Sequence, residues 1–277
     1  MTPAADILDL VSDLKATGEA FALATVVRTV SMTAAKAGAK AVIRPDGTIS
    51  DGWIGGGCAK SAVLKAAREA IADGKPRLVS LQPADLLQEQ GLAPGEENEG
   101  VRFASNMCPS QGSMDIFVEP MLPKPELIVC GASPVAVALT VLGRQFGYRV
   151  VVCAPKTGRE TFGEIDAFVD GFDVDGGDRR QRFIVVATQG SGDLAALRAM
   201  IRLEADHIAF VGSRRKMASL RAKLGGEDVA PGRLDRVKAP AGLDLGAITP
   251  QEIALSIIAE VIQAHRQSQQ AVTEQTA

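Results

Sequence analysis

The second half of the chain alternates between short apolar runs and longer amphipathic stretches. The apolar runs have the length of buried strands, and the stretches between them place apolar residues at helical spacing. The expected strands are 127–130, 149–153, 183–188 and 207–211, and the expected helices are 134–146, 193–204, 216–224 and 250–264. Strand and helix in alternation favour right-handed crossovers and a sheet covered on both faces. This half is therefore predicted to be a Rossmann-like, doubly wound parallel-sheet domain.

The first half mixes helices and strands without regular alternation. The expected elements are a helix over 1–14, a strand over 21–30, a hairpin-like pair around 44–48, a helix over 59–71 and mainly extended chain over 101–118. Pro45-Asp46-Gly47 between apolar runs indicates a turn, because proline presets one torsion angle and glycine supplies the unusual one. The chain as a whole is thus predicted to be α/β, with an α+β domain before the Rossmann-like domain.

Three prolines separate the two halves. Pro120, Pro123 and Pro125 lie within six residues, and proline disfavours both a helix interior and a central strand. We therefore expect a linker here, with one domain over 1–122 and a second over 123–277. The 277 residues, 46% of them hydrophobic, are enough to bury the cores of two domains.

Composition narrows the function classes. The 30 basic and 33 acidic side chains give a net charge of −3, which offers no general attraction to nucleic acid. The short basic runs 179–182 and 214–216 are interpreted mainly as solvated surface. No apolar stretch has the length of a membrane span, and the four cysteines show neither paired motifs nor disulfide-dense spacing. We expect a cytoplasmic protein, and a homodimer is left open.

Two cysteines lie in glycine-marked turns that suggest site chemistry. Gly55-Gly56-Gly57-Cys58 precedes the helix expected over 59–71, and Cys108 is followed by Pro109, Ser110, Gln111 and Gly112. Glycine lets a backbone present N–H groups to an anion, and a helix N-terminus favours thiolate over thiol and attracts phosphate. The alternative is that each cysteine is a small buried apolar residue in an ordinary turn.

The turn after the first strand of the second half is related to dinucleotide-binding turns. It reads Gly131-Ala132-Ser133-Pro134, with glycine at the first critical position and serine at the second, where a side chain would crowd a pyrophosphate. The next strand ends in Cys153-Ala154-Pro155 and lacks the acidic residue that binds a ribose in NAD enzymes. The turn therefore predicts the fold better than it predicts NAD as the ligand.

Further motifs accompany the cysteine turns in both halves. They are Thr25-Val26-Val27-Arg28-Thr29, Gly38-Ala39, Asp46-Gly47, Ile116-Phe117-Val118-Glu119-Pro120, Cys130-Gly131-Ala132, Thr188 with Asp193, Val211-Gly212-Ser213-Arg214, and Gly242-Leu243-Asp244-Leu245-Gly246-Ala247, which runs into a long segment over 249–257. With Gly55-Gly56-Gly57-Cys58 and Cys108, they resemble the XdhC/CoxI family of accessory proteins. That family matures molybdenum hydroxylases such as xanthine dehydrogenase and carbon monoxide dehydrogenase.

The resemblance implies a maturation factor or chaperone rather than an ordinary enzyme, with redox activity left open. Such a protein would bind molybdenum cofactor, either as molybdopterin or as molybdopterin cytosine dinucleotide. It would hold the cofactor during sulfuration or metal-site assembly and then insert it into an apo molybdenum hydroxylase. A sulfur-donating cysteine desulfurase is the second implied partner. Cys58 and Cys108 would be the catalytic thiols and metal ligands. The implied cofactor-binding residues, expected to face a cleft between the halves, are Gly55, Gly56, Gly57, Cys58, Lys60, Cys108, Gly131, Ala132, Ser133, Thr188, Gly212 and Ser213.

Departures from the family pattern suggest a specialised branch. The segment 30–34 replaces Gly-Ser-x-Pro-Arg, Lys60 replaces a glutamate, Pro109-Ser110 replaces two glycines, and Ser133 replaces a glycine. The carbon monoxide dehydrogenase accessory branch is attractive because that enzyme pairs molybdenum with copper, and copper(I) favours thiolates.

Two other function classes remain. An oxidoreductase that binds FAD or NAD(P) would use the Rossmann-like half, and a pure scaffold would carry only a vestigial site. A serine hydrolase is not expected, because no G-x-S-x-G motif occurs. Zinc is not expected either, because the thiols and the two histidines, His207 and His265, lack the usual ligand spacing.

Overall fold

The structure is a computed structural model that describes residues 7–107, 111–176, 181–225 and 232–276. The chain divides into two compact units. Unit 2 comprises Lys124–Gln270, and unit 1 comprises the chain before it together with Ala271–Ala277. No helix among the described residues has both the length and the apolar character needed to cross a membrane.

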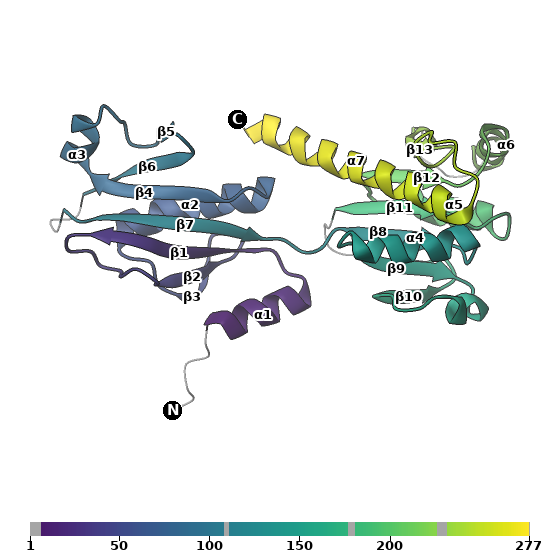
Figure 1. Ribbon diagram of the computed structural model, residues 1–277, viewed down its shortest axis with the longest axis horizontal. Helices are drawn as coiled ribbons and strands as arrows, with labels where there is room; N and C mark the ends of the chain where they lie inside the picture. Colours follow the sequence, from purple (N-terminus) through teal and green to yellow (C-terminus); the bar gives the residue numbers. More distant parts are fainter. Residues whose placement is uncertain (1–6, 108–110, 177–180, 226–231, 277) are drawn as a thin grey trace. The chain divides into compact units, whose positions relative to one another are not determined.

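Unit 1 is built on a seven-stranded mixed sheet with the order β3-β2-β1-β7-β4-β6-β5 (Figure 1). Its strands are β1 (Phe21–Val30), β2 (Lys40–Ile43), β3 (Ile49–Gly52), β4 (Arg77–Pro83), β5 (Glu97–Asn98), β6 (Val101–Asn106) and β7 (Ser113–Met121). Neighbouring strands are antiparallel except for β4 and β6, which are parallel. The short strand β5 forms the edge of the sheet beside β6.

Two helices cover opposite faces of this sheet. Helix α2 (Gly57–Asp73) packs an alanine-rich face, with Val63 at its centre, against buried residues of β1, β4 and β7. Helix α1 (Ile7–Thr17) packs Val11 and Leu14 against the other face of β1 and β2. Small alanines allow α2 to lie close to the strands. A third helix, α3 (Ala84–Glu89), follows β4.

The proline-rich segment differs from the sequence-based expectation. Strand β7 includes Pro120, which lies opposite Ala22 in β1, although its proline had been expected to exclude a central strand. The partner on the other side, β4, pairs with β7 only as far as Val118. Pro120 therefore lies where β7 has a neighbour on one side only, and the missing N–H costs no bond in the sheet.

Unit 2 is a six-stranded sheet with the order β10-β9-β8-β11-β12-β13, in which all neighbours are parallel. Its strands are β8 (Glu126–Cys130), β9 (Arg149–Ala154), β10 (Ala167–Asp170), β11 (Arg182–Val186), β12 (His207–Phe210) and β13 (Val237–Lys238). Numbered by their appearance in this unit, the strands lie in the order 3-2-1-4-5-6 of a dinucleotide-binding fold. The order reverses between β8 and β11, where such folds bind their ligands.

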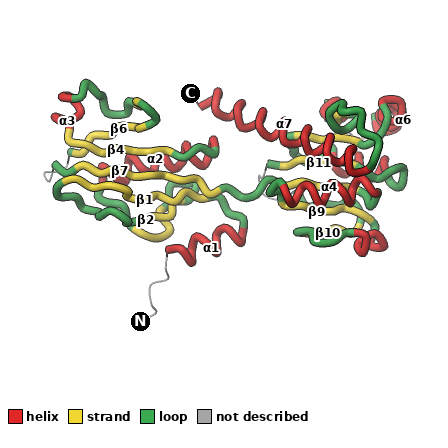
Figure 2. The backbone as a smooth tube through the Cα atoms, viewed as in Figure 1, coloured by secondary structure: helices red, strands yellow, loops and turns green. Residues whose placement is uncertain are grey.

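Helices cover both faces of the unit 2 sheet. On one face α4 (Pro134–Gln145) and α7 (Pro250–Thr276) pack on β8, β9 and β11 (Figure 2). On the other face α5 (Asp193–Met200) and α6 (Arg214–Leu224) pack on the alternate residues of the same strands. A parallel sheet with two helical layers confirms the predicted Rossmann-like architecture, preceded by the α+β unit 1.

One part of the basic run 179–182 is not solvated surface as predicted. Arg182 is buried, and its Nε donates to Oε2 of Glu126 at 3.2 Å. Arg149 donates to the other oxygen of the same carboxylate at 2.9 Å. The arginine at 182 therefore joins β11 to β8, while residues 179 and 180 lie outside the described part of the chain.

We predict that Gly131→Ala will destabilise unit 2 far more than Gly147→Ala. Both glycines have positive φ, +105° and +83°, so alanine is strained at each. Only at Gly131 would the new Cβ also lie 2.6 Å from Cα of Thr188, whereas at Gly147 it would meet nothing within 4 Å. We expect a loss of about 1 kcal/mol for the control and a further ~1–3 kcal/mol for Gly131→Ala. Urea unfolding followed through Tyr148, the single tyrosine, measures the free energy of unfolding of both variants. Equal losses of stability would contradict the close approach of Gly131 to the backbone of Thr188.

Candidate functional site

The first cysteine turn connects β3 to the start of α2. Gly55 has a φ of +120°, and a Cβ there would lie 3.0 Å from Cε of Met114 and 3.1 Å from Cβ of Ala59. Gly56 is the N-cap residue and supplies no side-chain hydrogen bond, while Gly57 begins the helix. A Cβ on Gly56 or Gly57 would meet nothing within 4 Å. The positive φ of Gly55, together with the narrow space beside Met114 and Ala59, favours glycine there, whereas the next two glycines leave the helix start open.

Cys58 follows directly in the first turn of α2. It is a free thiol, partly exposed, and packs at the edge of the unit 1 core. The first turn of α2 contains no acidic residue, and Lys60 is exposed in it. An anionic ligand here would meet uncapped backbone N–H groups and a cation, without a nearby carboxylate in that turn.

The chain around the second cysteine turn lies near the first one. Asn106 at the end of β6 donates from Nδ2 to the carbonyl of Gly112 at 2.7 Å, and Gln111 forms a bridge with Met32. β7 begins at Ser113, and its second residue, Met114, is the one that contacts Gly55. Cys108 itself lies outside the described residues. Its role as a second thiol, and the metal role of both cysteines, stay predictions.

Metal ligands other than these thiols are scarce. Across the described ranges, no group of three or more histidine, cysteine, aspartate or glutamate side chains could hold a metal ion. The other two cysteines, Cys130 and Cys153, lie side by side on β8 and β9 and are fully buried. A hydrogen bond to Cys153, together with burial, raises the pKa of the Cys130 thiol. This pair is structural and poorly suited to react with a ligand.

The turn after β8 borders a cavity of about 380 Å³, which we term the first cavity. Its lining residues are Gly131, Ala132, Ser133, Pro134, Pro155, Thr157, Gly158, Thr188, Gln189 and Ser191. It thus lies at the ends of β8, β9 and β11, where the strand order reverses. The structure brings together four of the residues predicted to bind the cofactor: Gly131, Ala132, Ser133 and Thr188.

Ser133 and Thr188 offer complementary hydrogen-bonding groups to this cavity. The Ser133 hydroxyl caps α4 by accepting the N–H of Ala136 at 3.2 Å, so its own proton is free to be donated. The Thr188 hydroxyl donates to the carboxylate of Asp193, so its oxygen is left to accept a bond. The first cavity therefore presents a hydrogen-bond donor, the Ser133 hydroxyl at the start of α4, and a hydrogen-bond acceptor, the Thr188 oxygen just after the end of β11.

Asp193 organises the β11 side of the site. Besides Thr188, it accepts the N–H of Gly190 at 3.0 Å and pairs with Nζ of Lys216 at 2.5 Å. Burial raises the pKa of Asp193, but the bonds from Lys216, Thr188 and Gly190 outweigh burial, so the pKa lies below its usual value. Lys216 also stands over the Phe210 ring. Arg214 and Arg215 are exposed, as the interpretation of 214–216 as mainly solvated surface expects, but sequence spacing did not reveal the partner of Lys216 on α5.

A second cavity, of about 640 Å³, lies at the ends of β12 and β13. Its lining residues are Val211, Gly212, Ser213, Arg214, Lys238, Ala239, Pro240, Ala241, Gly242, Leu243, Asp244, Leu245, Gly246, Ala247, Ile253 and Ser256. The sequence had singled out Gly212 and Ser213 as binding residues but not the Lys238 side chain. Nζ of Lys238 contacts the carbonyl of Gly242 and the buried carboxylate of Glu260.

Glu260 keeps Lys238 fixed at this cavity wall. His207 bonds the other carboxylate oxygen at 2.7 Å. Burial raises the pKa of Glu260, but the bonds from His207 and Lys238 lower it by more, so the group stays ionised well below neutral pH. His207 thus helps to hold the Glu260 carboxylate in place.

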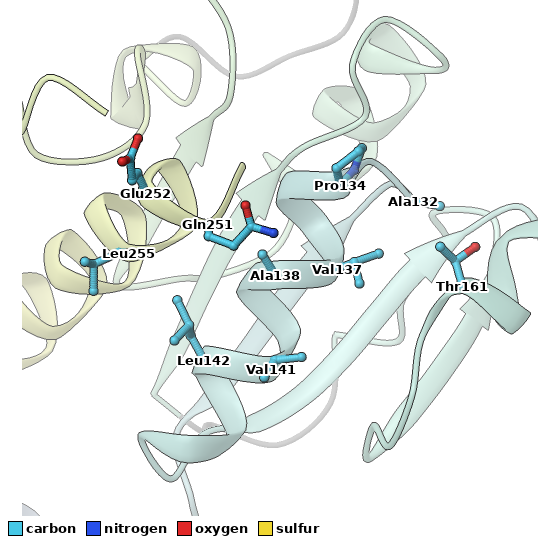
Figure 3. Close-up of a pocket in the computed structure, with 10 residues that line it drawn as sticks. All are labelled: Ala132, Pro134, Val137, Ala138, Val141, Leu142, Thr161, Gln251, Glu252 and Leu255. Atoms are coloured by element: carbon cyan, nitrogen blue, oxygen red, sulfur yellow. The ribbon is translucent and has the colours of Figure 1, made fainter. Parts of the chain in front are cut away.

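An apolar groove of about 780 Å³ lies between α4 and the start of α7 (Figure 3). Val137, Ala138, Val141 and Leu142 of α4 face it, and Leu255 approaches from α7. It adjoins the first cavity, since Ala132 and Pro134 line both. Its walls offer contact area but few groups that would orient a polar ligand.

Comparison with known proteins finds relatives longer than this chain. An uncharacterized protein of Escherichia coli, YqeB, is 29% identical over 258 residues, which is 88% of this chain and 43% of the relative. A Bacillus subtilis protein described as a probable subunit of xanthine dehydrogenase is 29% identical over 160 residues, 55% of this chain and 46% of the relative. The chain thus spans a little under half the length of these curated relatives.

Family models cover most of both units. The model of the XdhC and CoxI family matches residues 14–82, and the model of the XdhC Rossmann domain matches residues 127–261. A solved structure from Bacillus halodurans, described as a xanthine dehydrogenase, aligns over 94% of this chain and 96% of its own, with 20% identity and a TM-score of 0.45. On the strength of the two family models, the chain belongs to the XdhC/CoxI family.

Proposed function

We propose that this protein is a maturation factor for a molybdenum hydroxylase such as xanthine or carbon monoxide dehydrogenase. It binds molybdenum cofactor, assists its sulfuration or metal-site assembly and delivers it to the apo-enzyme. The observation that carries the proposal is the open helix start at Gly56 and Gly57, which presents the Cys58 thiol in a chain of this family. The Bacillus subtilis relative, by its description, supports the choice of client enzyme.

The chemistry of unit 1 suits the metal-bearing end of the cofactor. A thiolate binds soft metals, and copper(I) in particular, so Cys58 together with Cys108 would meet a sulfur-bearing molybdenum or a copper centre. The uncapped N–H groups of α2 and the Lys60 ammonium would hold phosphate. A cysteine desulfurase would be the sulfur donor, and the cytoplasm is the compartment in which free thiols persist.

The first cavity of unit 2 suits a phosphate and the sugar attached to it. The free proton of Ser133 matches a phosphate oxygen at the start of α4, and the acceptor oxygen of Thr188 matches a sugar hydroxyl. Molybdopterin cytosine dinucleotide carries both groups, and FAD carries them as well.

A second candidate function is an oxidoreductase of the same fold that uses FAD or NAD(P). The 3-2-1-4-5-6 strand order, with the first cavity at the switch point and the second cavity at β12 and β13, favours it. An absorbance spectrum of freshly purified protein separates the two candidates, because flavin absorbs in the visible region. A flavin spectrum at one equivalent per chain, without molybdenum, would favour the oxidoreductase.

We predict that Cys58→Ser will lower cofactor retention, because a hydroxyl cannot replace a thiolate at a soft metal. Molybdenum per chain, measured by mass spectrometry after gel filtration, should fall at least about fivefold. Ser61→Ala is the control, since Ser61 is an exposed residue of the same helical turn. Unchanged retention in Cys58→Ser, or an equal loss in the control, would contradict the role of the thiol.

Alkylation provides an independent check on the same thiol. Cys58 should react with iodoacetamide at least about tenfold faster than Cys130, because Cys130 is fully buried and has a raised pKa. Peptide mapping after timed labelling gives both rates, and labelling in urea shows whether the two thiols become equivalent on unfolding. Equal rates in the folded protein would contradict the assignment.

Asp193→Asn should destabilise unit 2 by about 1–3 kcal/mol at pH 7, because the variant leaves Lys216 without its charged partner. The folded-state pKa of Asp193 is lowered, so its stabilisation is present above the unfolded-state pKa of about 3.9 and is lost as the pH falls through the folded value. Wild type and variant should therefore converge below about pH 4. Asp235→Asn, which alters a solvent-exposed ion pair with Arg221, is the control and should cost less than about 0.5 kcal/mol. A constant difference down to pH 3 would refute this account of Asp193.

We also predict weak or no NAD binding by calorimetry. Ser133 stands where the dinucleotide-binding turn of NAD enzymes has glycine, and no acidic residue ends β9 to hold the adenosine ribose of NAD, so a dinucleotide would be held differently here. FAD or a cytosine dinucleotide should bind detectably in the same assay. Micromolar NAD affinity with neither alternative bound would reverse this prediction.

A further inference from the structure

The second cavity has the size and lining of a site for a flat heterocycle. Its volume of about 640 Å³ lies within the usual range for small-molecule sites. Most of its lining residues are apolar, and they include the Ala239-Pro240-Ala241 segment, Leu243 and Ile253. Apolar walls of this kind bury the faces of a ring system, whereas the few polar groups decide which edge the ring presents.

Two charged side chains at this cavity have no partner in the described part of the chain. Arg214 begins α6 and Asp244 lies in the loop after β13, and neither makes a hydrogen bond or ion pair there. The remaining polar groups are tied down: Lys238 is held by Glu260, and the Ser213 hydroxyl accepts the N–H of Lys216 at 3.2 Å. The available recognition groups are therefore one guanidinium fork and one carboxylate.

These two groups match complementary edges of one class of ring. A carboxylate accepts two adjacent N–H groups, as a 2-amino-4-oxo pyrimidine ring offers through its amino group and ring N–H. A guanidinium donates to two adjacent acceptors, as it does to O6 and N7 of guanine. An oxidised pterin presents the equivalent acceptors, the 4-oxo oxygen and N5, beside the same amino-amide edge. The reduced ring of molybdopterin keeps the 4-oxo oxygen and that edge, whereas its N5 carries a proton.

The position of the cavity agrees with this chemistry. A dinucleotide bound at the switch point of this strand order lies across the ends of the central strands, with its two halves on opposite sides. The first cavity lies at β8, β9 and β11, and the second lies at β12 and β13. A ligand whose phosphates lie at Ser133 would extend its second half towards Arg214.

We infer that the second cavity binds the 2-amino-4-oxopterin ring, with Asp244 pairing with its amino-amide edge and Arg214 donating to its 4-oxo oxygen. This inference rests on the proposed function, which supplies a pterin ligand. It extends that function by assigning the ring to residues of unit 2. Guanine shares the same edge, and the experiment separates the two rings.

The test uses the full chain and a free, fluorescent pterin, 6-hydroxymethylpterin, whose quenching reports binding. Its comparison ligand is 6-hydroxymethyllumazine, in which an oxo group replaces the 2-amino group. The wild type should bind the pterin at least about fivefold more tightly than the lumazine, because one bidentate edge contact is at stake. Asp244→Asn should remove this preference, and circular dichroism should show an unchanged fold, since Asp244 is exposed and unpartnered.

The neighbouring arginines provide a matched pair of variants. Arg214→Ala should weaken pterin binding at least about fivefold, whereas Arg215→Ala removes the same charge from the next position, which does not line the cavity, and should change affinity less than about twofold. Equal effects of the two variants, equal binding of pterin and lumazine, or the absence of saturable pterin binding would each overturn the inference. Tighter binding of guanosine than of pterin would also overturn it.

The outcome is separable from that of the proposed function. The free pterin carries no molybdenum, dithiolene or phosphate, so its binding does not depend on Cys58. Failed pterin binding together with Cys58-dependent molybdenum retention would remove only the ring assignment. If the protein binds pterin selectively but retains molybdenum equally well in the Cys58→Ser variant, the ring site is supported and the role of the thiol is contradicted.

Discussion

The unit 2 site depends on one buried carboxylate. Asp193 accepts bonds from the Thr188 hydroxyl and the Gly190 N–H and pairs with Lys216. It thereby joins the end of β11, the start of α5 and the first turn of α6 into one unit. Because its oxygens only accept, they fix the direction of the Thr188 hydroxyl and leave an acceptor towards the first cavity. The chemistry offered to a ligand at this edge follows from that arrangement.

Backbone geometry complements this constraint in both units. Gly131 must lack a side chain because its Cβ would collide with the backbone at Thr188, and Gly55 is favoured by its φ of +120° and by the narrow space beside Met114 and Ala59. Gly56 and Gly57 have no such packing requirement. Their absence of side chains leaves access to the start of α2 beside Cys58, as expected for a ligand that approaches the backbone closely. Packing and access are thus separate reasons for glycine within a single turn.

The sequence predicted the parallel sheet of unit 2 well, because apolar runs and capped helices are local signals. It also identified Gly131 and Ser133, since a strand, a glycine and a capping serine occur in immediate succession. It could not reveal the Asp193–Lys216 pair or the Glu260–Lys238 pair, because each joins residues from elements distant in the chain. Pro120 was misassigned for a related reason: whether a strand position has one neighbour or two depends on the register of β4 against β7.

The most direct test of the account is to identify the small molecule that accompanies the protein. Mass spectrometry of the denatured supernatant, with metal analysis of the same sample, measures both the organic ligand and its metal. The account predicts a pterin-derived ligand together with molybdenum, in constant proportion, when the protein is produced in cells that make the cofactor. A stoichiometric flavin or nicotinamide dinucleotide, without pterin or molybdenum, would contradict it.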